Sequence, residues 1–153
     1  IPFVEVVSPV TGKGYQQTGV LPDIAATPAK ALDVAYEVAL QQLHAQATDE
    51  ANRKRLAWEL RVYQLRTQKN VPDNLQPYAG QFGVRSVVYI DGALYYQREG
   101  STRRLLEPLS NHHFLLDKQT LLEYSPDYQS FRIHQMHGTV VTAERTDVTA
   151  NVN

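Results

Sequence analysis

Between residues 28 and 46, apolar positions recur at steps of three and four, which is the spacing of one face of an α-helix. Six residues form this stripe: Leu32, Ala35, Tyr36, Ala39, Leu40 and Leu43. Thr27 can accept a hydrogen bond from a free N–H group of the first turn, and Pro28 suits the first helical position because it lacks an N–H. The pattern predicts an amphipathic helix from about Pro28 to about Gln46.

Residues 48–50, Thr-Asp-Glu, offer a second N-cap with acids in the first turn, and the helix that follows is predicted to end near Gln68. Asp49 with Arg53, and Glu50 with Lys54, have the i,i+4 spacing and the acid-first order that stabilise a helix. Two neighbouring apolar rows give this helix a broad buried face: Leu56, Leu60 and Tyr63 in one, and Trp58, Val62 and Leu65 in the other.

From Tyr78 onward, apolar and polar residues alternate and turn signals recur at short spacing, which predicts antiparallel strands. The predicted strands are residues 84–90, 94–97, 104–106, 113–116, 120–124, 131–134 and 139–142. Asp91-Gly92 is a strong hairpin signal because both positions tolerate a positive φ, and His137-Gly138 marks another turn. Strands in sequence order favour a meander that curls into a small barrel or half-barrel. The expected core contains Val88, Ile90, Leu94, Phe114, Leu122, Phe131 and Ile133.

Near the start of the chain, residues 3–7 form a β-branched run that predicts one further strand. A single strand cannot bury both of its faces, and no neighbouring strand is predicted before residue 84. The strand therefore needs a sheet to pack in.

The amino-acid composition indicates a globular protein and excludes several kinds of site. The chain has 153 residues, of which 42% are hydrophobic and 20% charged, as in a globular protein of one ordinary or two small domains. The net charge of −1 gives no general attraction to nucleic acid or anionic membranes, and no apolar run has the length of a membrane span. The absence of cysteine excludes disulfides, thiol catalysis and thiolate metal sites. The chain starts with Ile1 and its single methionine is Met136, so we expect it to be a piece of a longer protein.

Residues 15–24, YQQTGVLPDI, followed by residues 28–35, PAKALDVA, resemble the end of the catalytic domain of tail-specific (C-terminal processing) serine peptidases. The similarity is to the branch with tricorn and the interphotoreceptor retinoid-binding proteins, where the pattern is roughly W-E-G-x-G-V-x-P-D-I and then A-x-x-A-L-x-x-A. Residues 75–83, 92–98, 106–110 and 114–116 resemble the β-rich C-terminal domain of some bacterial tail-specific-peptidase-like proteins. A similar L-x-x-Y-x-G-x-Y opening occurs in accessory domains behind penicillin-binding-type serine hydrolases.

The resemblance implies an α+β chain with two parts. Residues 1–70 would be the C-terminal end of a peptidase domain, with a terminal strand and a helical pair, and residues 71–153 an antiparallel β domain shaped as a meander or barrel. The parent would be a bacterial, periplasmic or secreted serine endopeptidase that cuts peptide or protein substrates. The alternative is a non-catalytic β-barrel binding or docking module. Expected partners are the missing peptidase domain and a second copy of the chain through residues 1–45, with no nucleic acid and no membrane span.

In that peptidase family, a glutamate that supports the catalytic histidine precedes the Gly-Val-x-Pro-Asp motif by three residues, and the matching position here is Gln16. A neutral amide holds a hydrogen bond but does not stabilise a developing imidazolium charge. Three alternatives stay open: an impaired parent, a pseudo-enzyme, or a Ser/Lys dyad that needs no glutamate. No serine of the chain has the context of the family nucleophile: Ser8, Ser86, Ser101, Ser110, Ser125 and Ser130. The chain alone is therefore expected to be inactive.

Three further groups of residues have a functional and a structural interpretation. A basic cluster on the second helix could bind nucleic acid, but interleaved acids favour a solvated face: Arg53, Lys54, Arg55, Arg61 and Arg66. Four histidines could bind metal, but their spacing sends neighbours to opposite strand faces, so we expect no metal or other cofactor: His112, His113, His134 and His137. Five tyrosines could line a ligand groove, but cross-strand packing is the favoured role: Tyr89, Tyr95, Tyr96, Tyr124 and Tyr128.

Overall fold

The computed structural model describes residues 7–10, 12, 14, 23–68 and 70–146. The chain falls into two units, residues 1–34 and residues 35–153. In the first unit, Val7 and Gly14 form an isolated antiparallel bridge, and the Gly12 amide donates to the Ser8 carbonyl at 2.8 Å. Apart from Val7, the strand predicted at residues 3–7 lies outside the described residues.

Both predicted helices are present. Helix α1 spans Ala31–Gln46, so its predicted start at Pro28 is wrong. Residues 28–30 instead form a turn, in which the Lys30 amide donates to the Thr27 carbonyl at 2.9 Å. Helix α2 spans Glu50–Thr67 and begins as predicted, because the Asp49 carboxylate caps it by accepting from the Asn52 amide at 2.8 Å.

The apolar stripe of α1 is largely exposed. Leu40 is buried, and the rings of Tyr36 and Tyr63 on α2 lie 4.7 Å apart between centroids. Leu32 and Leu43 are nevertheless 80% and 54% exposed. The stripe therefore has the predicted helical spacing without the burial that such spacing usually indicates.

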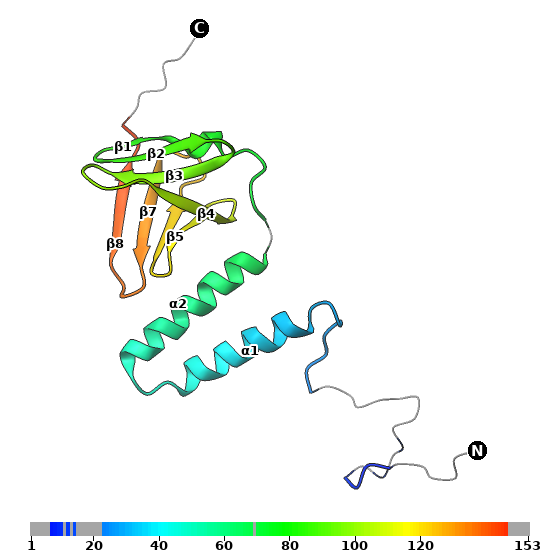
Figure 1. Ribbon diagram of the computed structural model, residues 1–153. Helices are drawn as coiled ribbons and strands as arrows, with labels where there is room; N and C mark the ends of the chain where they lie inside the picture. The colour runs from blue at the N-terminus through cyan, green and yellow to red at the C-terminus, as the bar shows by residue number, and fades with distance from the viewer. Residues whose placement is uncertain (1–6, 11, 13, 15–22, 69, 147–153) are drawn as a thin grey trace. The chain divides into compact units, whose positions relative to one another are not determined.

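The second half of the chain forms an eight-stranded antiparallel sheet in which each strand pairs with the next (Figure 1). The strands are β1 (Gly80–Phe82), β2 (Arg85–Ile90), β3 (Ala93–Arg98), β4 (Arg104–Ser110), β5 (His113–Asp117), β6 (Thr120–Tyr124), β7 (Ser130–Gln135) and β8 (Val140–Glu144). A short 3₁₀ helix, η1 (Gln76–Tyr78), precedes β1. The α+β class and the antiparallel meander are confirmed, whereas β1 was not predicted.

The Asp91-Gly92 hairpin sets the register of β2 and β3. Asp91 and Gly92 have φ values of 49° and 83°, as a two-residue turn with two positive φ angles requires. The turn pairs Ile90 with Ala93 and, further along, Val87 with Tyr96. Asp91-Gly92 is therefore the hairpin turn that the sequence predicted.

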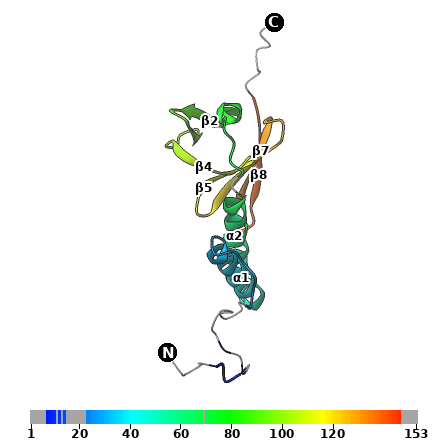
Figure 2. The same cartoon turned by 90° about the vertical axis from the view of Figure 1, so that its right-hand side faces the viewer.

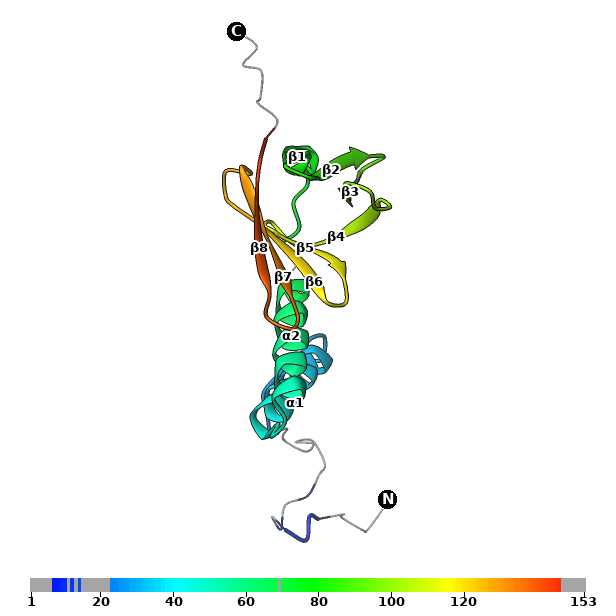
Figure 3. The same ribbon diagram turned by 90° about the vertical axis from the view of Figure 1, so that its left-hand side faces the viewer.

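The sheet curls into a nearly closed barrel. β4 changes partner along its length: its first residues pair with β3 and its last residues pair with β5. In Figure 2, β2 and β4 lie on one side and β7 and β8 on the other, and Figure 3 shows the same separation from the opposite side. After β8, the Thr146 amide donates to the Gln81 carbonyl of β1 at 2.7 Å, so the first and last strands are linked.

Aromatic and aliphatic side chains fill the barrel. The largest fully buried ones are Tyr78, Phe82, Phe114, Phe131, Leu94, Leu106, Leu122 and Val87. Tyr78 closes the end at which β4, β6 and β8 finish, since its hydroxyl donates to the Asn111 carbonyl and its own carbonyl accepts from the Tyr124 hydroxyl at 2.9 Å. Burial is the main cause that raises the pKa of Tyr78 to about 12.

The expected core is correct for its five residues on β3, β5, β6 and β7 and wrong for its two residues on β2. Val88 is only partly buried and Ile90 is 36% exposed, while Val87 faces the interior and is 1% exposed. Apolar residues lie on both faces of this strand, so the alternation of apolar and polar residues does not show which face is the inner one. The pairing of Val87 with Tyr96 across the hairpin selects it.

A second apolar cluster lies outside the barrel, where α2 covers the sheet. Trp58, Leu109 and Leu121 are its buried members, with Val62 and Leu65 packed against them. The row Trp58, Val62 and Leu65 that was predicted as part of a buried face is therefore the side of α2 that contacts the sheet.

Candidate functional site

The sequence places one residue, Gln16, at a catalytic position, that of the supporting glutamate. Gln16 lies outside the described residues. Among those described, the pair that most resembles a nucleophile and its base is Ser110 and His113, with Oγ and Nδ1 2.8 Å apart. The two residues are opposite each other in the β4–β5 hairpin.

This Ser110–His113 pair lacks the access that catalysis requires. Ser110 is only 6% exposed, so a substrate carbonyl cannot reach its hydroxyl from solvent. Burial also lowers the pKa of His113, although the nearby Glu123 carboxylate opposes that shift. The contact satisfies a buried hydroxyl at the end of a hairpin, which is a structural role.

Glu123 is the centre of a polar network on the outer face of the sheet. Its carboxylate contacts Arg132 at 2.7 Å, Nε2 of His134 at 2.7 Å and Arg61 of α2 at 3.4 Å. Burial acts to raise the pKa of Glu123, but the His134 hydrogen bond and the Arg132 charge outweigh it and lower the pKa. The pKa of His134 is also lowered, chiefly by burial and then by the Arg61 charge. The network ties α2 to β6 and β7.

The remaining histidines and tyrosines were considered for metal binding and for a ligand groove. In the described ranges, no group of three or more His, Asp or Glu residues could hold a metal ion. Tyr96 and Tyr124 are 8% and 3% exposed and belong to the barrel core, as the packing interpretation predicts. Tyr89 is 39% exposed, near the end of β2, on the same strand face as Val87 and opposite Leu94.

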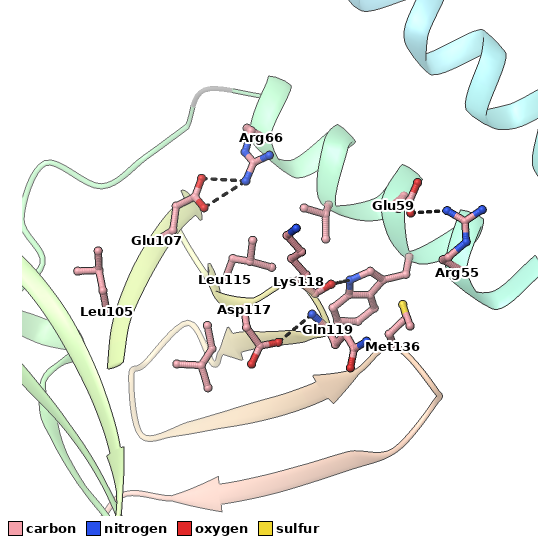
Figure 4. A pocket seen from close by; sticks show the side chains of 13 residues that line it. Arg55, Glu59, Arg66, Leu105, Glu107, Leu115, Asp117, Lys118, Gln119 and Met136 are labelled. Atoms are coloured by element: carbon pink, nitrogen blue, oxygen red, sulfur yellow. Dashed lines mark hydrogen bonds and ion pairs between the residues drawn. The ribbon is translucent and has the colours of Figure 1, made fainter. Parts of the chain in front are cut away.

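A groove with a volume of about 680 Å³ lies between α2 and the outer face of the sheet (Figure 4). We call it the α2 groove. Its floor is apolar and comprises Trp58, Val62, Leu105, Leu115, Leu116 and Met136. Helix α2 supplies the first two, and three separate regions of the sheet supply the others.

Trp58 fixes the position of α2 over this groove. Its side chain is 7% exposed, and its indole Nε1–H donates to the Lys118 carbonyl at 2.8 Å (Figure 4). An indole that is both buried and hydrogen-bonded holds one orientation, since turning it would leave the donor without a partner. The wall formed by α2 is thus anchored to the β5–β6 turn.

The rim of the α2 groove is charged, and most of its charges are paired. Arg66 on α2 binds both oxygens of Glu107 on β4, at 2.9 and 3.1 Å, and Arg55 binds Glu59 at 2.7 Å (Figure 4). Asp117 pairs with Arg104 and also accepts from the Gln119 amide at 2.8 Å. Among the described residues, no ion pair engages the ammonium group of Lys118.

Sequence reasoning missed this groove. The sequence identified the row of α2 residues that forms one wall. On β4 and β5, however, neighbouring leucines differ in burial, and the sequence does not distinguish the exposed leucines from the buried ones. Leu105 is 56% exposed and Leu106 is 1% exposed, although they are neighbours on one strand. Alternation could have indicated that one of them faces outward; it could not have indicated that α2 passes beside it.

No protein-family model, curated protein or solved structure matches this chain. Within the described residues, neither helix combines the length and the apolar character needed to cross a membrane.

Proposed function

We propose that this chain acts as a non-catalytic binding module whose α2 groove holds a peptide segment of a partner protein. The preferred segment carries one or two large apolar side chains next to an acidic residue. The observation that supports this proposal is an apolar floor of six side chains beneath a rim whose charges are already paired, apart from Lys118.

The size and exposure of the groove support a ligand of this kind. Its volume of about 680 Å³ falls in the range of about 300–1,000 Å³ found for ligand sites. Leu105 is 56% exposed, so a large apolar side chain on the floor remains in water when the groove is empty. Covering such a side chain is favourable by about 25 cal/mol for each Å² of apolar area removed from water.

The charges on the rim favour an acidic neighbour in the ligand. The Arg55–Glu59 and Arg66–Glu107 pairs are internally neutral and leave no net attraction. Lys118, whose carbonyl already holds Trp58, presents its ammonium group at the edge of the same groove. A carboxylate placed next to the apolar anchor would gain a partner there, and a lysine at that position would be repelled.

The test uses two short probes, acetyl-Gly-Leu-Phe-Asp-Gly-amide and the same peptide with Lys in place of Asp. Trp58 is the single tryptophan of the chain and contributes to the groove floor, so its fluorescence reports binding directly. We expect saturable binding of the Asp peptide and at least about tenfold weaker binding of the Lys peptide, a difference of about 1.4 kcal/mol.

Two variants with matched controls locate the site. Leu105→Glu should abolish binding, whereas Val140→Glu, at a residue that is 52% exposed on β8, should not. Lys118→Glu should remove the preference for the Asp peptide, and Lys54→Glu on the exposed Glu50 side of α2 should preserve it. Equal binding of both peptides to all four variants would refute the proposal.

A second proposal rests on the sequence resemblance: this module belongs to a bacterial, periplasmic or secreted serine endopeptidase of the tail-specific family. The resemblance at residues 15–24 and 28–35, followed in the same order by residues 75–83, supports it. The nucleophile would then be contributed by residues outside this chain. We expect the purified chain to hydrolyse no peptide or nitrophenyl ester. Turnover that persists through purification and disappears when one serine of the chain is replaced would contradict this expectation.

A further inference from the structure

A second hollow lies at the mouth of the barrel, at the end opposite Tyr78. It has a volume of about 480 Å³. All strands from β2 to β8 contribute to its lining, which includes Arg85, Arg98, Arg104, Leu116, Thr120, Gln135 and Val141. Tyr96 and Ile133, which are 8% and 7% exposed, also line it and belong to the core cluster below. We call this hollow the barrel mouth.

The three arginines of the barrel mouth lie on the inner face of the sheet. Arg85 lies two positions from buried Val87, and Arg104 lies two positions from buried Leu106. Arg98 likewise lies two positions from Tyr96, which faces the core. Because side chains two apart on a strand share a face, all three arginines occupy core-side positions on adjacent strands.

Placing these arginines together is unfavourable unless an anion joins them. Arg85 and Arg98 are directly opposite each other in the β2–β3 ladder, and like charges in that position destabilise a sheet. Within the described part of the chain, the buried Nε of Arg85 has no hydrogen-bond partner. A buried donor left without a partner typically costs about 1–3 kcal/mol.

Among the described residues, an acidic side chain pairs with only one of the three arginines. Arg104 is paired with Asp117, but no acidic residue is among the described residues that line the barrel mouth. The lining adds uncharged hydrogen-bonding groups from Ser101, Thr102, Thr120 and Gln135. The remaining wall is apolar, so the hollow combines a positive rim with an apolar interior.

We infer that the barrel mouth is a binding site for a small amphipathic anion, with a phosphate or carboxylate group held by Arg85 and Arg98 and an apolar part resting on Tyr96 and Ile133. A guanidinium group matches the geometry of both anions because it donates two parallel hydrogen bonds. This site shares Leu116 with the α2 groove but differs from it in its charge and its ligand.

The experiment titrates the ¹⁵N-labelled chain with phenyl phosphate, with phenylacetate and with neutral benzyl alcohol. The Arg85 Nε–Hε resonance is followed, because that N–H has no partner in the free protein. We expect a saturable shift with the two anions and none with the alcohol, and weaker binding as salt is added. The tighter of the two anions identifies the natural ligand as a phosphate or a carboxylate.

Arginine variants test whether the barrel mouth is the site of anion binding. Arg85→Gln and Arg98→Gln should each weaken anion binding by about tenfold or more, since each removes a charge-assisted contact. The control is Arg103→Gln, which alters an exposed neighbour of Arg104 that does not line the mouth. Because Arg98 is exposed, its variant tests the site even if Arg85→Gln does not fold.

Two results would overturn the inference. One is the absence of a saturable shift for both anions up to about 20 mM at low salt, well above the millimolar affinities expected of weak small-ligand sites. The other is an equal loss of binding in Arg103→Gln and Arg98→Gln, which would indicate general attraction to a basic surface.

Discussion

Leu121 and Leu122 are neighbours on β6 and are both 0% exposed, yet they belong to different apolar clusters. Leu121 faces outward and is buried beneath α2 with Trp58. Leu122 faces inward and packs in the barrel with Phe114 and Phe131. Replacing each by alanine makes the same chemical change on opposite faces of one strand.

The size of the effect follows from complete burial at both positions. Leu→Ala removes about three carbon groups at about 0.8 kcal/mol each, or about 2.4 kcal/mol of transfer free energy. The cavity that remains brings the expected loss to about 3 kcal/mol, within the 2–5 kcal/mol range seen for such substitutions. A loss of this size is a large fraction of the roughly 5–15 kcal/mol that stabilises a typical domain.

The two variants should differ in which part of the protein loosens. For Leu121→Ala, we expect Trp58 emission to shift to the red at lower urea than the loss of β-sheet circular dichroism, because α2 separates from a barrel whose core is intact. For Leu122→Ala, both signals should change together at a lower urea midpoint, because the barrel itself is destabilised. The single tryptophan makes the fluorescence signal specific to the contact of α2 with the sheet.

One result would refute this reasoning. If Leu121→Ala leaves the midpoint of the Trp58 transition at its wild-type value, the outward face of β6 does not support α2. The proposed α2 groove would then lose one of its walls.

Three other predictions concern acid stability, truncation and association. Because the pKa values of Glu123 and His134 are lowered from 4.5 and 6.5, their stabilising effect is present above those values and is lost as the pH falls. The urea midpoint should therefore decline from pH 7.5 to 4, and Glu123→Gln should flatten the decline below about pH 5 relative to Glu144→Gln. A version starting at Val71 should fold alone, with dispersed amide resonances; a version starting at Thr48 is the control that keeps α2 over the sheet. If the version starting at Val71 gave a random-coil spectrum while the version starting at Thr48 folded, the predicted boundary would be wrong. The full chain should self-associate through residues 1–45, and light scattering should show less association when residues 1–24 are removed; a strict monomer at high micromolar concentration would contradict this.

The sequence by itself determined the local elements of this protein. Asp49 identifies the start of α2, and Asp91-Gly92 identifies a hairpin, because each depends on hydrogen bonds or φ angles within a few residues. The helical spacing on α1 and the alternation on β3 to β8 also predicted the correct type of element. These are short-range properties, which the neighbouring residues alone can set.

Only the tertiary structure decided which faces meet. The choice of Val87 over Val88 as the inner residue came from the ladder with β3, and closure came from Thr146 reaching Gln81 across most of the β domain. The helical stripe containing Leu32 looked like a buried face, but in the folded chain it is largely exposed. The α2 groove and the barrel mouth arise in the same way, from residues far apart in the chain. Their neighbours are set by strand register and by the packing of α2, which depend on the whole sheet rather than on any local pattern.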